Sequence, residues 1–144
     1  MGVTSTGKNK ISTMNFLKTF ENFQDDILKR IANELAETLH CDRFGACVHF
    51  AELFTEKVFE VNPNLLDCFN VIEGYVTTND GKFEHTWIET NDKERIDPTI
   101  IQFNGPIKNR IKKKTYRGKE YLEDKTDTWF SERRKQFPQH IFKN

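Results

Sequence analysis

The apolar residues of the chain change their spacing near its midpoint, and this change restricts the possible fold class. Over residues 14–39 they recur at steps of three and four, which is typical of a long amphipathic helix. A second helix is expected over residues 46–60, ending before Asn62-Pro63. Segments typical of strands come next. Because helices and strands occupy separate parts of the chain, we expect an α+β domain with helices packed on an antiparallel sheet.

Three segments with strand character follow the second helix, at residues 65–76, 82–90 and 94–97. Residues 78–81 read Thr-Asn-Asp-Gly, a strong hairpin signal because these residue types accept the positive φ of a tight turn. A short turn is expected at residues 91–93, and Pro98 ends the third strand. A last short helix is predicted over residues 127–136.

The 144 residues are enough for one compact domain, which we expect to span residues 14–106. Residues 1–13 are polar, lack an apolar period and are expected to form a flexible leader. Residues 107–144 hold twelve basic and five acidic side chains, so this part has a net positive charge. The net negative charge of residues 1–106 has the same magnitude. We therefore expect a basic C-terminal extension that docks on the domain.

The lack of a visible membrane span or secretion signal, together with the number of cysteines, favours a cytoplasmic location. No stretch reaches the roughly 18 consecutive apolar residues that a membrane span requires, and no secretion signal is visible. Three cysteines, Cys41, Cys47 and Cys68, do not make a disulfide framework and suit a reducing, intracellular compartment. Gly2 and Thr6 fit a short myristoylation pattern, for which a merely polar leader is the alternative.

A zinc site is the other standard interpretation of neighbouring Cys and His residues. His40-Cys41 and Cys47-Val-His49 lie close together in the sequence. No Cys-x-x-Cys pair exists, however, and no second pair of ligands follows at zinc-finger spacing. We therefore expect neither a metal nor another cofactor.

His85 and Asp97 lie at equal distances from residue 91, in the second predicted turn. If the hairpin closes there, the two side chains face each other across antiparallel strands. Directly opposed Cβ atoms are about 4.5–5.5 Å apart, so a carboxylate can accept a hydrogen bond from an imidazole N–H. Such a bond fixes the tautomer and stabilises the imidazolium. Trp87 is expected to shield the pair from water.

Cys47 opens the second predicted helix and begins its apolar stripe. A thiol in a first helical turn faces unpaired backbone N–H groups and the positive end of the helix dipole, which favour thiolate. The same N–H groups can stabilise an oxyanion. Each residue also has a structural interpretation, because buried cysteines are commonly inert and Asp-Pro commonly ends a strand. Cys41 also lies near a helix end and is a competing candidate for the nucleophile. Arg43-Phe44-Gly45 follows it, so it lacks the helical turn and small residue that follow Cys47.

Three short segments together resemble the core of transglutaminase-like enzymes, a permuted relative of the papain-like cysteine proteases. They are Gly45-Ala-Cys-Val-His-Phe-Ala51, His85-Thr-Trp-Ile-Glu89 and Ile96-Asp-Pro-Thr99. The resemblance implies that Cys47 is the nucleophile, His85 the general base and acid, and Asp97 the residue that orients His85. It also implies a papain-like fold whose central helix carries the nucleophile at its N-terminus.

The chain departs from the family pattern at several positions. Val48 stands where the family commonly has Trp or Arg, and residues 61–76 contain no arginine. The side chain that completes the oxyanion hole is not evident, and Gln24 on the first helix is the one candidate. These departures affect the expected substrate and reaction outcome more than the triad.

The resemblance implies a thiol enzyme that attacks protein or peptide amides through a thioester on Cys47. Water as acceptor gives a protease or deamidase, and a lysine amine gives crosslinking; small size and no visible calcium loop favour hydrolysis. The alternative is a non-catalytic binding module on the same fold. In that case the basic residues 108–119 would bind nucleic acid or an acidic protein. They could equally have a structural role.

Overall fold

The computed structural model describes residues 23–125 and residue 143. The predicted leader, the start of the first predicted helix and the predicted helix at 127–136 therefore lie outside the described residues. Among the residues that are described, no helix is both long and apolar enough to cross a membrane.

Two helices precede the sheet, as predicted. The first covers residues 23–36 within the described part of the chain. The second, α2, spans Ala46–Val61 and follows Gly45, whose left-handed φ of 91° suits a residue without a side chain. The helix ends at Val61 and is capped by Asn62, which precedes Pro63. The predicted apolar stripe of α2 is buried, from Cys47 at 7% exposure to Phe54 and Val58 at 0%.

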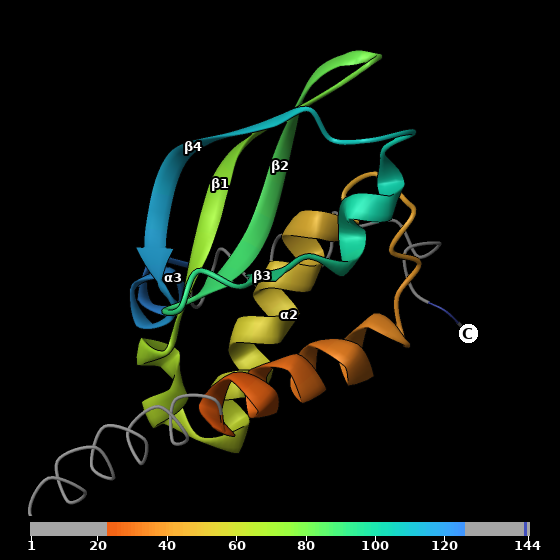
Figure 1. Cartoon of the computed structure of the whole chain (residues 1–144). Coiled ribbons are helices and arrows are strands. Elements are labelled where there is room, and N and C mark those ends of the chain that lie inside the picture. Colours follow the sequence, from red (N-terminus) through yellow and green to blue (C-terminus); the bar gives the residue numbers. More distant parts are fainter. Residues whose placement is uncertain (1–22, 126–142, 144) are drawn as a thin grey trace, which may run out of the picture.

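The sheet has four antiparallel strands in the order β3-β2-β1-β4. The strands are β1 Phe69–Thr78, β2 Gly81–Thr90, β3 Arg95–Ile96 and β4 Asn109–Arg117, with 3₁₀ helices η1 Pro63–Asp67 and η2 Pro98–Gln102. A final helix, α3, spans Gly118–Lys125. The tight turn at Asn79-Asp80 joins β1 and β2 as predicted, and α2 contacts both β2 and η2 (Figure 1). The fold class is α+β, with helices on an antiparallel sheet.

The start of the first strand differs from the prediction. Residues 63–67 form η1 instead of extended chain. Pro63 opens this turn, and the side chain of Asn62 accepts a hydrogen bond of 3.0 Å from the N–H of Asn64. Both features favour a helical turn over a strand, so β1 begins only at Phe69.

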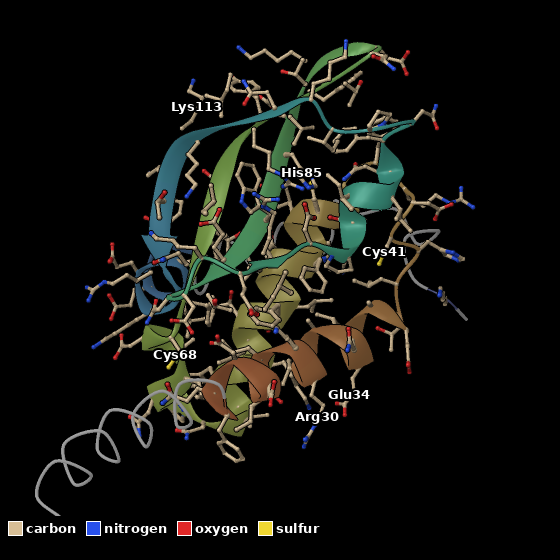
Figure 2. The ribbon with its side chains drawn as sticks, viewed as in Figure 1. Arg30, Glu34, Cys41, Cys68, His85 and Lys113 are labelled. Atoms are coloured by element: carbon tan, nitrogen blue, oxygen red, sulfur yellow. The ribbon has the colours of Figure 1, made fainter. Side chains whose placement is uncertain are left out.

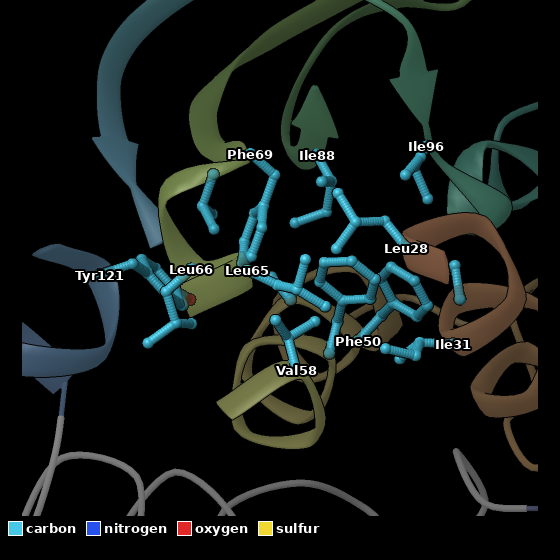
Figure 3. Packing of buried hydrophobic residues seen from close by; sticks show 14 of the residues in the cluster. Leu28, Ile31, Phe50, Val58, Leu65, Leu66, Phe69, Ile88, Ile96 and Tyr121 are labelled. Atoms are coloured by element: carbon cyan, nitrogen blue, oxygen red, sulfur yellow. The ribbon is translucent and has the colours of Figure 1, made fainter. Parts of the chain in front are cut away.

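A buried apolar cluster joins the helix at residues 23–36, α2 and the sheet (Figure 3). Phe54 of α2 packs edge-on against Phe69 of β1, with ring centroids 5.0 Å apart. Leu28 from the first helix and Ile88 from β2 are both fully buried in the same cluster. Each such side chain contributes about 1.5–3 kcal/mol when it leaves water. This packing holds α2 against β2, and with it the first turn of α2.

Residues 109–117 of the predicted basic extension form β4, an edge strand paired with β1. A β-bulge interrupts the pairing, because Gly74 lies opposite Lys112 while Glu73 lies opposite Lys114. A Cβ atom at Gly74 would lie 2.0 Å from the carbonyl oxygen of Ile111, so only glycine permits this approach. The division into leader, domain and extension stays a prediction, but part of the basic segment belongs to the sheet.

Candidate active site

His85 and Asp97 are joined by a hydrogen bond in the structure. Nε2 of His85 lies 2.9 Å from each carboxylate oxygen of Asp97. The imidazole is buried on β2, and Asp97 follows β3 as the residue that caps η2. Trp87 stacks on the His85 ring at a centroid distance of 5.9 Å and is itself 1% exposed. The predicted shielding of this pair by Trp87 is therefore present.

The predicted direct opposition of His85 and Asp97 was wrong. The strands pair Ile88 with Ile96, and the turn is closed by a 2.8 Å hydrogen bond from the Thr90 N–H to the Glu94 carbonyl. The centre of the turn is therefore residue 92, not 91. Asp97 lies beyond the end of β3 and reaches His85 diagonally, a separation that polar side chains can still span.

Asp97 is held by two further donors. Nη1 of Arg110 donates to Oδ2 at 2.9 Å, and the hydroxyl of Thr99 donates to Oδ1 at 3.3 Å. The guanidinium of Arg110 also lies over the ring of Trp87, 5.0 Å from its centroid. The carboxylate is thus fixed in orientation and its negative charge is stabilised.

The contact of Arg110 with Asp97 was not predicted from the sequence. Arg110 lies 13 residues after Asp97 and within the basic run of β4, where it resembles its neighbours. Residues 61–76 contain no arginine, in contrast to the pattern of the transglutaminase-like enzymes that the motifs resemble. The structure brings an arginine to Asp97 from β4 instead. Finding it from sequence would have required the register of β4 on β1.

Cys47 lies in the first turn of α2 and lines the same cavity as His85, a space of about 630 Å³. Burial lowers the pKa of His85, but hydrogen bonds to Asp97 and Cys47, together with their negative charges, raise it to about 9. This pKa favours the imidazolium form of the ring at neutral pH. An imidazolium beside a thiol favours the thiolate.

Gln102, the last residue of η2, also lines this cavity. Its Nε2 donates to the carbonyl of Thr99 at 3.0 Å and lies 3.4 Å from Nδ1 of His85. The sequence offers Gln24 as the candidate side chain that completes the oxyanion hole. Gln24 lines a different cavity together with Cys68, so Gln102 is the amide side chain beside Cys47 and His85.

The other two cysteines lie elsewhere. Neither Cys41 nor Cys68 lines the cavity that contains His85. Burial raises the pKa of both thiols, and Asp67 raises that of Cys68 further. The thiol of Cys41 is directed at the carbonyl of Ala36, at 3.8 Å. The geometry therefore places Cys47, and not Cys41, with His85.

Within the described part of the chain, no group of three or more His, Cys, Asp or Glu side chains could hold a metal ion. Comparison with protein-family models, with curated proteins and with solved structures finds no match. The interpretation of the site therefore depends on its own geometry and on the motif resemblance.

Two arginines of β4 allow a matched test of the Asp97 contacts. We expect Arg110→Ala to lower the free energy of unfolding by about 1.5–3 kcal/mol, because it removes a hydrogen bond to a buried charge. Arg117, whose side chain is 63% exposed, pairs with Glu120, and its removal should lower that free energy by less than about 1 kcal/mol. Urea denaturation measures both. Equal losses would contradict the assignment.

The raised pKa of His85 gives a pH-dependent prediction. Because the folded value of about 9 lies above the ordinary 6.5, this group's contribution to stability is complete below about pH 6.5. It is lost as the pH rises through about 9. In Asp97→Asn the pKa of His85 should fall towards its ordinary value. Titration by imidazole NMR tests this, and an unchanged midpoint in the variant would show that Asp97 does not hold the imidazolium.

Proposed function

We propose that the chain is a cysteine-dependent hydrolase or acyl transferase that acts on protein or peptide amides. The observation that supports this most is the placement of Cys47 in one cavity with His85, whose ring is bonded to Asp97 at 2.9 Å. Three residue types required for thiol catalysis thus meet, from α2, β2 and the end of β3. Desolvation of this site strengthens each charge interaction within it.

In the proposed first step, the Cys47 thiolate attacks the carbonyl carbon of the amide. A C–S bond forms, and the negative charge moves to the carbonyl oxygen. Ala46 and His49 already donate their N–H groups to the carbonyls of Arg43 and Gly45. The donors proposed for this oxyanion are therefore the N–H of Cys47 and the amide of Gln102. His85 then gives its proton to the leaving amine as the C–N bond breaks, leaving a thioester.

In the second step, neutral His85 accepts a proton from the incoming water or amine. The nucleophile attacks the thioester carbonyl, the C–S bond breaks and the thiolate is restored. Asp97 keeps the proton of Nε2 in place, so that Nδ1 faces the reaction. We favour water as the acceptor, hence a protease or a deamidase, because the sequence shows no calcium loop of the kind expected for a crosslinking enzyme.

The same geometry supports a transglutaminase-like, papain-related fold. The nucleophile opens a helix packed on an antiparallel sheet, and the His and Asp follow in that order along the chain. This is the arrangement that the three motifs imply. The free state of all three cysteines accords with the cytoplasmic location that we propose.

A non-catalytic binding module is the second candidate, and the exposed lysines of β4 favour it. A module of this kind should bind nucleic acid with an affinity that falls steeply with salt. That affinity should be unchanged by Cys47→Ala. An enzyme should instead lose all turnover in the same variant while remaining folded.

Thiol reactivity provides the first test. Iodoacetamide at pH 7 should alkylate Cys47 at least about tenfold faster than Cys41 or Cys68, and His85→Ala should remove this advantage. Peptide mass spectrometry gives the three rates within a single sample. Cys47 labelling that is no faster than at the other cysteines, and insensitive to His85→Ala, would count against the enzyme.

The reaction class can then be read from cell proteins treated with the protein or with its Cys47→Ala variant. New termini indicate a protease, a gain of about one mass unit at glutamine a deamidase, and linked peptides an acyl transferase. The variant serves as the control for cleavage by other enzymes. Under the proposal one of the three changes appears only with the unmodified protein.

A further inference from the structure

The cavity that contains Cys47 continues across the sheet to its edge strand. Besides Cys47 and His85, it is lined by Lys113 and Lys114 of β4. Figure 2 shows His85 on β2 and Lys113 on β4, with β1 between these two strands. The cavity is therefore a groove that leads from the thiol to a pair of lysines.

The β-bulge explains how two consecutive lysines line one cavity. Along a regular strand, neighbouring side chains point to opposite faces of the sheet. Here Lys112 pairs with Gly74 and Lys114 with Glu73, so Lys113 is the additional residue of the bulge. Bulges redirect side chains in this way and are frequent beside functional sites.

An aromatic ring lies beside each of the two ammonium groups, and Lys82 also lies over the ring of Tyr75, 4.4 Å from its centroid. Nζ of Lys113 lies 5.3 Å from the centroid of Tyr75, and Nζ of Lys114 lies 4.6 Å from that of Tyr116. Neither lysine forms an ion pair with any residue of the described part of the chain. Glu73 lies opposite Lys114 across the strands, but with no ion pair formed both ammonium groups can accept an anionic group in the groove.

We propose that Lys113 and Lys114 form a subsite for a carboxylate side chain of the substrate peptide. This inference rests on the proposed function, because it places that side chain relative to the amide attacked by Cys47. Neighbouring strands are about 4.8 Å apart, so β2 and β4 are separated by about 10 Å. An extended peptide advances about 3.3 Å per residue. The acidic residue should therefore lie about three positions from the attacked carbonyl.

The remaining charges of the groove favour a peptide over a nucleic acid. Glu73 and Glu84 line the same cavity, on β1 and β2. A continuous phosphate backbone that followed the groove would bring charge against these carboxylates. A peptide can instead present one carboxylate at the lysine end and neutral residues elsewhere.

The test uses thiol-reactive peptides in which the number of residues between the reactive group and a Glu side chain is varied. One series is chloroacetyl-(Gly)n-Glu amide and the other is acetyl-Glu-(Gly)n chloromethyl ketone, so that both chain directions are sampled. Each probe has a twin with Gln in place of Glu, and n runs from zero to five. The measured quantity is the Glu/Gln ratio of second-order rate constants for alkylation of Cys47 at low ionic strength.

In one of the two series the Glu/Gln ratio of rate constants should rise to about five when n is two or three. An effect of this size is expected for a partly exposed ion pair. The ratio should fall to about one in the double variant Lys113→Gln/Lys114→Gln. The matched control is Lys108→Gln/Lys119→Gln, which removes two exposed lysines that do not line the cavity. The control should keep the maximum.

A ratio that is flat in n, or that survives loss of Lys113 and Lys114, would overturn the subsite. The subsite would also be overturned if a twenty-nucleotide oligothymidylate slowed alkylation of Cys47 by the Glu and Gln probes equally. The lysines would then bind the phosphates of a nucleic acid. These probes alkylate any accessible thiol, so the ratio is measurable even if Cys47 is not activated. Failure of the proposed function would appear separately, as Gln probes that react no faster at Cys47 than at Cys68.

Discussion

The carboxylate of Asp97 is the group on which the arrangement of the candidate site depends. It accepts hydrogen bonds from His85 on β2 and from Arg110 on β4, and so links a central strand, the end of β3 and the far edge strand. Arg110 in turn lies over Trp87, which stacks on His85. Burial lowers the pKa of the imidazole, and the hydrogen bond to Asp97 helps to raise it to about 9. A buried imidazolium is stable only with such a partner, because burial alone would neutralise it.

The position of the thiol depends on a different kind of interaction. The apolar stripe of α2 packs into the cluster that includes Phe69 and Ile88, and this fixes the helix on the sheet. Gly45 permits the sharp entry into the first turn, where Cys47 lies. Non-directional packing thus positions Cys47, the proposed nucleophile, whereas directional hydrogen bonds position His85. The cavity lies where these two parts meet.

The sequence predicted those elements whose pattern is local. Helical spacing identified α2 and its buried face, and Asn79-Asp80 identified the hairpin, because both depend on residues close in the chain. The register of β3 was wrong by one position at the centre of the turn, since Lys93 adopts a positive φ of 70° that its residue type does not suggest. Asp97 is still bonded to His85 as predicted, because its carboxylate reaches the imidazole diagonally and the motif resemblance indicated the same pair.

What the sequence could not predict are the contributions of β4. Arg110 and Lys113 both belong to one basic run, and nothing in its composition separates the residue that contacts Asp97 from the one that lines the groove. Their roles follow from the pairing of β4 with β1 and from a bulge opposite Gly74. Both are long-range features, and their energies depend on strands separated by more than 30 residues. One basic segment thus supplies both the contact to Asp97 and part of the cavity lining.

The central claim is that Cys47, His85 and Asp97 act as one coupled unit. A double-mutant cycle tests this most directly, using the rate constant for alkylation of Cys47 by iodoacetamide at pH 7 in four proteins: the unmodified chain, His85→Ala, Asp97→Asn and the double variant. For a coupled unit, each single change slows the reaction and the double variant is no slower than His85→Ala, within about twofold. Independent effects that multiply in the double variant, or an Asp97→Asn variant as reactive as the unmodified chain, would contradict it.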